Sequence, residues 1–124
     1  MTDYLFIGLG GFLGANARYL VGGWAAKVYG STFPYGTFLI NVTGSFFIGL
    51  VLTLITERFI APPNFRLFFI VGFTGAYTTF STYMFESLSL VQERAYLAAI
   101  AYALGSIAVG LVAVTAGVIA GRAL

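Results

Sequence analysis

The amino-acid sequence predicts an all-α integral membrane protein, and two observations carry this prediction: its composition and the spacing of its charges. Of the 124 residues, 60% are hydrophobic and only 8% are charged, whereas a soluble domain usually has about 25% charged residues. The charges leave long apolar stretches, which predict four transmembrane helices at about residues 4–27, 34–57, 66–91 and 95–121. Because the connections are short, we expect residues 1–124 to form a single four-helix transmembrane domain.

The composition of the chain also limits what it can do. It has no Cys and no His, which excludes disulfides, thiolate chemistry, imidazole catalysis and the usual zinc ligands. We therefore expect no enzyme activity. The net charge of +2 is too small and too scattered for a nucleic-acid surface. We also expect no cleavable signal peptide, because the first apolar stretch is too long and lacks a basic start.

The first predicted helix carries a positive charge, Arg18, within its apolar stretch. A central Arg costs roughly 2.5–3.5 kcal/mol on insertion scales, and less if the side chain reaches the interface. Two interpretations follow. Arg18 extends to the membrane surface, or it places a fixed positive charge at an aqueous vestibule, where it would favour anions.

The second and fourth predicted helices each have a stripe of polar or small residues spaced by four, which places them on one helix face. The stripe of the second helix consists of Thr37, Asn41 and Ser45, and that of the fourth consists of Tyr102, Ser106 and Gly110. Asn41 is the most informative, because lipid cannot satisfy an amide at this depth. It either bonds to a neighbouring helix or donates to a passing solute. The hydroxyls of Tyr102 and Ser106 can likewise donate to an anion.

The third predicted helix contains an unusual run between Gly72 and Tyr83. Five hydroxyl residues fall within nine positions of it: Thr74, Thr78, Thr79, Ser81 and Thr82. Glycines and β-branched residues weaken a helix, so we predict a helix that breaks at mid-membrane and restarts near Thr79. Backbone groups at such a break need protein, water or an ion as partners, which is typical of a site or cavity. The alternative is a continuous helix whose hydroxyls bond to carbonyls one turn earlier.

Two aromatic residues follow the predicted break on one helix face. Phe80 and Tyr83 are three residues apart, and Glu86 lies three further on, near the far interface. The edge of an aromatic ring is positive, so two ring edges on one wall can hold an anion without a full charge. The restarted helix also presents its positive N-terminal end toward mid-membrane. The alternative is that the two rings only pack against neighbouring helices.

Small residues and balanced charges bear on assembly. Three pairs of small residues four apart predict close helix packing and a homo-oligomer: Gly10 and Gly14, Ser45 and Gly49, and Gly117 and Gly121. Lys and Arg set orientation in a membrane. Three of them lie on the side of the termini (Arg58, Arg66, Arg122) against two or three on the other side (Lys27, Arg94, with or without Arg18). This balance either still places the termini in the cytoplasm or predicts dual topology, with chains inserting both ways.

Three motifs together resemble the Fluc (CrcB-type) family of bacterial fluoride channels and span most of the chain. They are Gly10-Gly11-Phe12-Leu13-Gly14 with Arg18-Tyr19, Pro34-Tyr35-Gly36-Thr37 with Asn41 and Gly44, and Gly75-Ala76-Tyr77-Thr78-Thr79-Phe80-Ser81-Thr82-Tyr83 with Glu86. The sequence departs from the usual family pattern at three positions. Tyr83 stands in place of a second Phe, Ala76 in place of a Gly, and Gly110 in place of a hydroxyl residue.

The resemblance implies an antiparallel, dual-topology homodimer with two pores. It implies passive fluoride export across a bacterial cytoplasmic (inner) membrane, which protects against fluoride toxicity. It implies a structural Na⁺ at the dimer interface, held by backbone carbonyls at the helix break, here those of Gly75 and Thr78 from each chain. It also implies a fluoride pathway with Arg18 near a vestibule; the pathway residues here are Asn41, Phe80, Tyr83, Ser81, Thr37, Tyr102 and Ser106.

The main alternative function is a small four-helix proton-coupled multidrug or cation exporter. Such exporters have an essential Glu in the first span, whereas this first span has Arg18 and no acid after Asp3. Glu86 lies near a helix end, which disfavours proton-coupled export. A structural subunit of a larger complex is a second alternative, but it would need no run of hydroxyls at mid-membrane.

Overall fold

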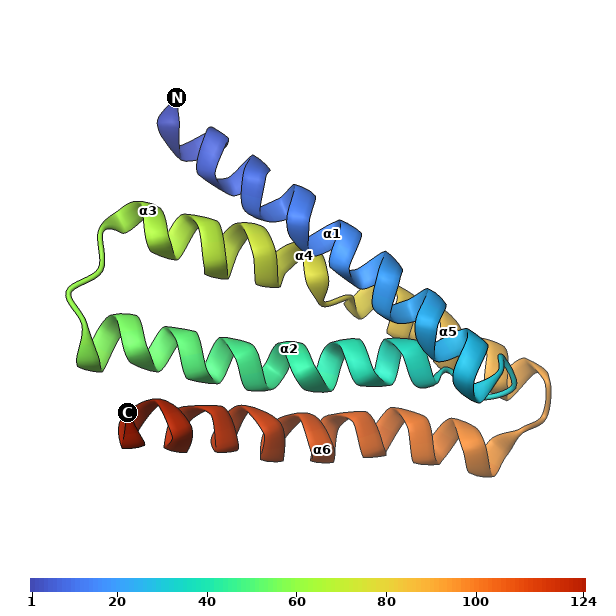
Figure 1. Ribbon diagram of the computed structural model, residues 1–124. Coiled ribbons are helices and arrows are strands. Elements are labelled where there is room, and N and C mark those ends of the chain that lie inside the picture. The colour runs from blue at the N-terminus through green and yellow to red at the C-terminus, as the bar shows by residue number, and fades with distance from the viewer.

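The protein is built from helices alone. A computed structural model describes all 124 residues and contains no strand, which confirms the all-α class that the sequence predicts. The elements are α1 (Thr2–Tyr29), α2 (Tyr35–Thr53), the π-helical turn η1 (Leu54–Arg58), α3 (Pro63–Arg66), the π-helical segment η2 (Leu67–Thr74), α4 (Gly75–Tyr77), α5 (Phe80–Gln92) and α6 (Tyr96–Ala123). η1 continues α2, and α3, η2 and α4 follow one another without a gap, so the helices form long rods (Figure 1).

The rods run back and forth between two ends of the molecule. Both termini and the link from η1 to α3 lie at the left-hand end of Figure 1, whereas the links from α1 to α2 and from α5 to α6 lie at the other end. The first of those two links begins at Gly30, whose φ of 80° lies in the left-handed region that glycine adopts without strain. The link into α3 carries Pro62, and Pro63 occupies the first turn of α3, where its missing N–H costs no hydrogen bond.

Three helical stretches are long and apolar enough to cross a membrane: Thr2–Tyr29, Tyr35–Arg58 and Tyr96–Ala123. They overlap the first, second and fourth spans that the charge spacing predicts. The region of the third predicted span, 66–91, is divided among α3, η2, α4 and α5 and is therefore not one long helix.

Glycines allow the rods to approach closely. A Cβ at Gly10 would collide with the backbone of Phe68 in η2, and a Cβ at Gly49 would collide with the backbone of Val114 in α6. The same holds for Gly14 against Phe73 and for Gly117 against Phe46. Most of the small-residue pairs that predict close packing are thus used within one chain, so their spacing alone does not establish a homo-oligomer.

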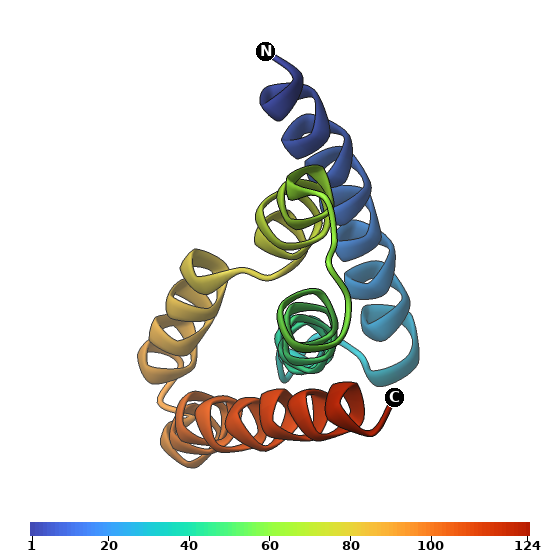
Figure 2. The same cartoon turned by 90° about the vertical axis from the view of Figure 1, so that its left-hand side faces the viewer.

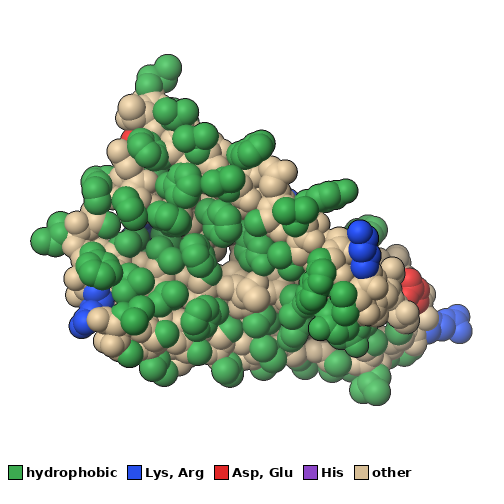
Figure 3. All heavy atoms as spheres, in the orientation of Figure 1, with side chains coloured by type: hydrophobic (Ala, Val, Ile, Leu, Met, Phe, Trp, Pro, Cys, Tyr) green, Lys and Arg blue, Asp and Glu red, His purple; other side chains and the backbone are tan.

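The molecule has a small core and an apolar exterior. The buried hydrophobic cluster consists of Tyr83, Leu90, Ala99 and Tyr102, at the junction of α5 with α6. Large apolar side chains cover much of the surface that Figure 3 shows, and the charged side chains visible there lie toward the ends. An exterior of this kind suits lipid rather than water. Together with the three long apolar helices, it makes this a multi-pass membrane protein.

Candidate ion pathway

Two extended residues separate α4 from α5. Helix α4 ends at Tyr77 and α5 begins at Phe80; between them Thr78 has φ −80° and ψ 156°, and Thr79 has φ −147° and ψ 115°. Figure 2 shows α5 displaced to one side of the rod that ends in α4. The Thr78 hydroxyl still donates to the Thr74 carbonyl one turn earlier (2.9 Å), yet the backbone leaves the helix at this residue.

Asn41 of α2 pairs with the backbone of this extended segment. The Thr79 N–H donates to Asn41 Oδ1 at 2.9 Å, and Asn41 Nδ2 donates to the Thr79 carbonyl at 3.1 Å. These bonds join two helices, which is one of the two interpretations that the sequence allows for Asn41. One hydrogen of the amide is not used by them, because an Asn side chain carries two N–H donors.

Two backbone carbonyls lose their usual helical donors at this place. In an unbroken helix the carbonyl of Gly75 would accept from the Thr79 N–H, which instead donates to Asn41. The carbonyl of Thr78 would accept from the Thr82 N–H, which instead donates to the Thr79 hydroxyl at 3.3 Å and so caps α5. The side chains of Asn41 and Thr79 therefore leave these two carbonyl oxygens available to other partners.

A cavity of about 280 Å³ lies beside the extended segment. Its lining brings together residues of α2, η2, α5 and the segment itself: Asn41, Gly44, Ser45, Ile48, Thr74, Thr78, Thr79, Phe80 and Tyr83. The structure thus places three of the predicted pathway residues at one cavity: Asn41, Phe80 and Tyr83. It does not place Thr37, Ser81, Tyr102 or Ser106 in that lining.

Phe80 and Tyr83 differ strongly in exposure. Their ring centroids are 6.0 Å apart with planes at 60°, but Phe80 is 72% exposed whereas Tyr83 is 7% exposed. The Tyr83 hydroxyl donates to the backbone carbonyl of Ala103 in α6. The residue that departs from the Fluc pattern therefore has a partner for its extra polar group, and that partner lies in the neighbouring helix.

Helix α6 carries two of the predicted pathway residues, Tyr102 and Ser106. The ring of Tyr102 meets the ring of Tyr83 edge to face, with centroids 5.3 Å apart. The Tyr102 hydroxyl donates to Glu86 Oε1 at 3.2 Å. The Ser106 hydroxyl is buried and has no hydrogen-bond partner in the protein, so it is free to bond to a bound ion or water.

Arg18 lines a second and larger cavity of about 520 Å³. The other lining residues are Ala15, Tyr19, Gly22, Gly23, Thr37, Ile40, Thr79 and Thr82. Thr79 therefore lines both cavities. Arg18 forms no ion pair, since the single salt bridge of the protein joins Arg122 to Glu57. Its unpaired charge favours anions in this cavity.

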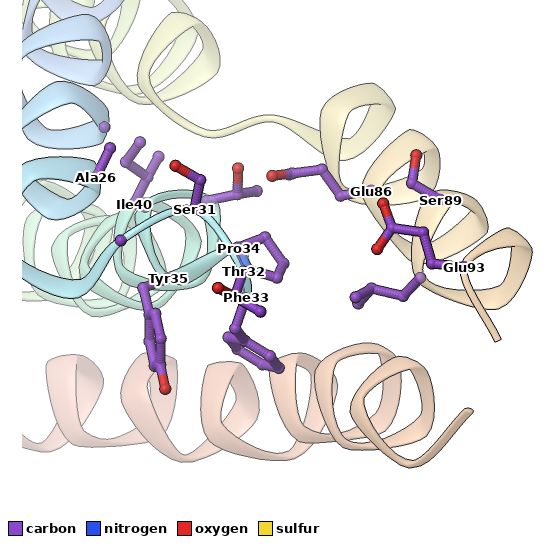
Figure 4. A pocket seen from close by; sticks show the side chains of 15 residues that line it. Ala26, Ser31, Thr32, Phe33, Pro34, Tyr35, Ile40, Glu86, Ser89 and Glu93 are labelled. Atoms are coloured by element: carbon purple, nitrogen blue, oxygen red, sulfur yellow. The ribbon is translucent and has the colours of Figure 1, made fainter. Parts of the chain in front are cut away.

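A third cavity, of about 290 Å³, lies between the α1–α2 link and α5. Figure 4 shows Glu86 extending from α5 toward that link, with Ser89 farther along the same helix and Glu93 immediately after its end. Thr37 contributes to this cavity and also to the cavity of Arg18. The sequence analysis identified Glu86 by its spacing of three residues from Tyr83, whereas Glu93 follows no such spacing.

Comparison with known proteins shows the family of this chain. Residues 5–118 match the family described as CrcB-like protein, Camphor Resistance (CrcB). A fluoride-specific ion channel FluC of Chloroflexus aurantiacus is 48% identical over 122 residues, which is 98% of this chain and 97% of that protein. FluC of Acidobacterium capsulatum is 48% identical over 96% of this chain and 95% of its own length. FluC of Rhizobium meliloti is 40% identical over 100% of this chain and 99% of its own length. The chain therefore belongs to the CrcB-like protein family.

Proposed function

We propose that this protein is a fluoride-specific ion channel that exports fluoride passively across the bacterial cytoplasmic membrane and so protects against fluoride toxicity. The observation that carries the proposal is its 40–48% identity, over nearly the full length of both chains, to proteins named fluoride-specific ion channel. A channel of this kind performs no covalent chemistry, and we assign the protein no enzyme activity. A proton-coupled exporter is not favoured, because the first span carries Arg18 and no acid after Asp3.

The donor set of the site supports fluoride as the ion. Fluoride is small and strongly hydrated, so a pathway must replace its water with many donors and yet avoid a full charge that would trap it. The cavity beside the extended segment offers the free Asn41 N–H and the ring edge of Phe80. We assign the remaining steps of the pathway to Tyr83 and to the hydroxyls of Thr37, Ser81, Tyr102 and Ser106. Of these, Ser106 has an unpaired buried hydroxyl.

We assign Arg18 to a vestibule of the pathway. The cavity that Arg18 lines shares Thr79 with the cavity that Phe80 lines, and the Arg18 charge has no acidic partner. A fixed positive charge in a vestibule raises the local concentration of anions, while the uncharged donors farther in provide the selective binding.

The functional unit that we propose is an antiparallel, dual-topology homodimer with two pores. Two observations support it: the balance of Lys and Arg on the two sides, and the 72% exposure of Phe80 beside the cavity. A ring edge that binds an anion must be shielded from bulk lipid, so a second chain is needed to close the pathway around Phe80.

We also propose a structural Na⁺ at the dimer interface, held by the carbonyls of Gly75 and Thr78 from each chain. These residues fit such an ion, because both carbonyls have lost their helical donors and Gly75 is exposed on the surface of the single chain. Unwound backbone carbonyls are typical Na⁺ ligands within membranes. No group of three or more acidic side chains competes with them for a cation. When bound, the ion would add a fixed positive charge and join the extended segments of the two chains.

Ion efflux from liposomes tests the proposed function. Liposomes that contain the purified protein and fluoride should discharge fluoride quickly once a counter-ion path is added, whereas chloride should stay inside. Equal flux of the two ions, or a strict dependence on a proton gradient, would overturn the proposal. Fast export of a lipophilic cation driven by a proton gradient would favour the exporter instead.

A further inference from the structure

Helix α2 holds the extended segment at successive positions of one stretch. Asn41 pairs with Thr79 through two hydrogen bonds of 2.9 and 3.1 Å. Two residues later, Thr43 shares a hydrogen bond of 2.9 Å with the Tyr77 hydroxyl. At Gly44 a Cβ would collide with the methyl group of Thr78. Helix α2 therefore contacts both Tyr77, where α4 ends, and the two extended residues that follow it.

We propose that Asn41 is a positioning residue, whose side-chain amide holds the Thr79 backbone extended and thereby sets where α5 begins and how Phe80 faces the cavity. The consequence for flux rests on the proposed channel function, but the consequence for the backbone does not. This role goes beyond donation of a hydrogen bond to the ion.

The amide acts by competing with the helix. Without Asn41, the Thr79 N–H could return to the Gly75 carbonyl, which is its partner in a continuous helix. The run through Tyr77 and Phe80 would then continue as one helix. Phe80 would turn on the helix surface, and the Gly75 carbonyl would no longer be available to a cation. The Asn41 side chain thus determines both the position of the Phe80 ring and the availability of the Gly75 carbonyl.

The same bonds determine which end of the amide faces which group. Of the two ends of the Asn41 amide, only the oxygen can accept from the Thr79 N–H, and only the nitrogen can donate to the Thr79 carbonyl. The orientation of the amide is therefore fixed by the backbone. Because Asn41 lines the cavity together with Phe80, the uncommitted N–H has a fixed direction before any ion arrives.

The experiment compares Asn41→Ala, Asn41→Asp and the matched control Ser45→Ala by backbone chemical shifts of Thr79 and by fluoride efflux. Ser45 lies one turn along α2, lines the same cavity, and donates to the Asn41 carbonyl at 2.7 Å without touching Thr79. In Asn41→Ala, the Cα and Cβ shifts of Thr79 should lose their extended values, and efflux should fall at least tenfold. In Ser45→Ala the Thr79 shifts should stay extended.

Asn41→Asp separates positioning from conduction. An aspartyl oxygen can still accept from the Thr79 N–H, so the Thr79 shifts should remain extended, while a carboxyl group on an anion pathway should still suppress efflux. Extended Thr79 shifts in Asn41→Ala together with lost efflux would overturn the proposal and leave Asn41 as an ion ligand alone. Absence of fluoride efflux in the unmodified protein would reject the channel function, whereas the shift comparison would still decide the positioning role.

A measurement on the unmodified protein covers the case in which Asn41→Ala does not fold. The chain has only three Asn residues, at 16, 41 and 64, so ¹⁵N labelling of Asn resolves the Asn41 amide. One of its two protons should exchange slowly with solvent, with or without fluoride, while the other responds to added fluoride. Equal, rapid exchange of both protons would contradict the pairing with Thr79.

Discussion

Tyr83 illustrates how a single residue can be identified from sequence while its partner cannot. The resemblance marks it as a departure because it carries a hydroxyl where a Phe is usual. Nothing in the sequence connects it to Ala103, twenty residues away, because backbone carbonyls have no sequence signal. The structure shows that the hydroxyl bonds to that carbonyl and that the ring is buried. In the same way, the spacing of Asn41 predicts a polar group on a helix face, but only the fold shows that Thr79 is its partner.

Removing the Tyr83 hydroxyl should change stability more than function. Tyr83→Phe keeps the ring and its edge but loses the bond to the Ala103 carbonyl, which should cost about 0.5–1.5 kcal/mol. We expect fluoride efflux within twofold of the unmodified protein and a lower melting temperature in detergent. A collapse of efflux with unchanged stability would assign the hydroxyl to the ion pathway itself.

Removing the ring edge of Phe80 should have the opposite effect. Phe80 is 72% exposed in the single chain, so Phe80→Ile removes little packing within that chain and should cost at most about 1.5 kcal/mol. If the ring edge binds fluoride, efflux should collapse while the dimer elutes unchanged on size exclusion. Normal efflux from a stable dimer would show that Phe80 only packs. The pathway would then run through Asn41 and the hydroxyls.

At the scale of helices, apolar stretches predict well which residues form a span, but they predict poorly whether that span is a regular α-helix. The first, second and fourth predicted spans overlap single long helices, because an uninterrupted apolar run has no reason to leave the helix. The third predicted span is divided among α3, η2, α4 and α5. Its extended residues depend on a contact with Asn41 of α2, which is far away in sequence. The sequence predicts that the helix begins again near Thr79, and in the structure α5 begins at Phe80. It did not predict the π-helical segments η1 and η2, for which no periodicity signal exists in so apolar a run.

Close packing of α1 against η2 gives a prediction at this scale. A Cβ at Gly14 would collide with the backbone of Phe73, whereas a Cβ at Gly8 of the same helix meets nothing within 4 Å. Gly14→Ala should therefore destabilise the protein by about 1–3 kcal/mol, while Gly8→Ala should be neutral or stabilising by up to about 1 kcal/mol. Thermal unfolding in detergent measures both. Equal effects of the two changes would mean that α1 and η2 are farther apart than the structure has them.

The whole molecule raises the question of orientation, since neither end carries a clear excess of Lys and Arg. Three of these residues stand against two or three on the two sides. Arg122 is joined to Glu57 by a bidentate pair at 2.9 and 3.0 Å, yet acidic residues contribute little to orientation during insertion. The pair therefore links η1 to the C-terminal end of α6 in the folded protein and leaves the charge balance of the inserting chain unchanged. A balance of this kind gives no strong preference for either orientation.

Dual topology can be tested cleanly because the chain has no native Cys. A single Cys added after Leu124 should react with a membrane-impermeant reagent from both faces of the membrane in roughly equal amounts. Two Lys added at the same place should shift the labelling toward one face. The same change should lower fluoride efflux per protein, because an antiparallel dimer needs both orientations. Labelling of the unmodified chain from one face alone would contradict dual topology. If efflux were also undiminished by the added Lys, a parallel assembly would have to form the pathway.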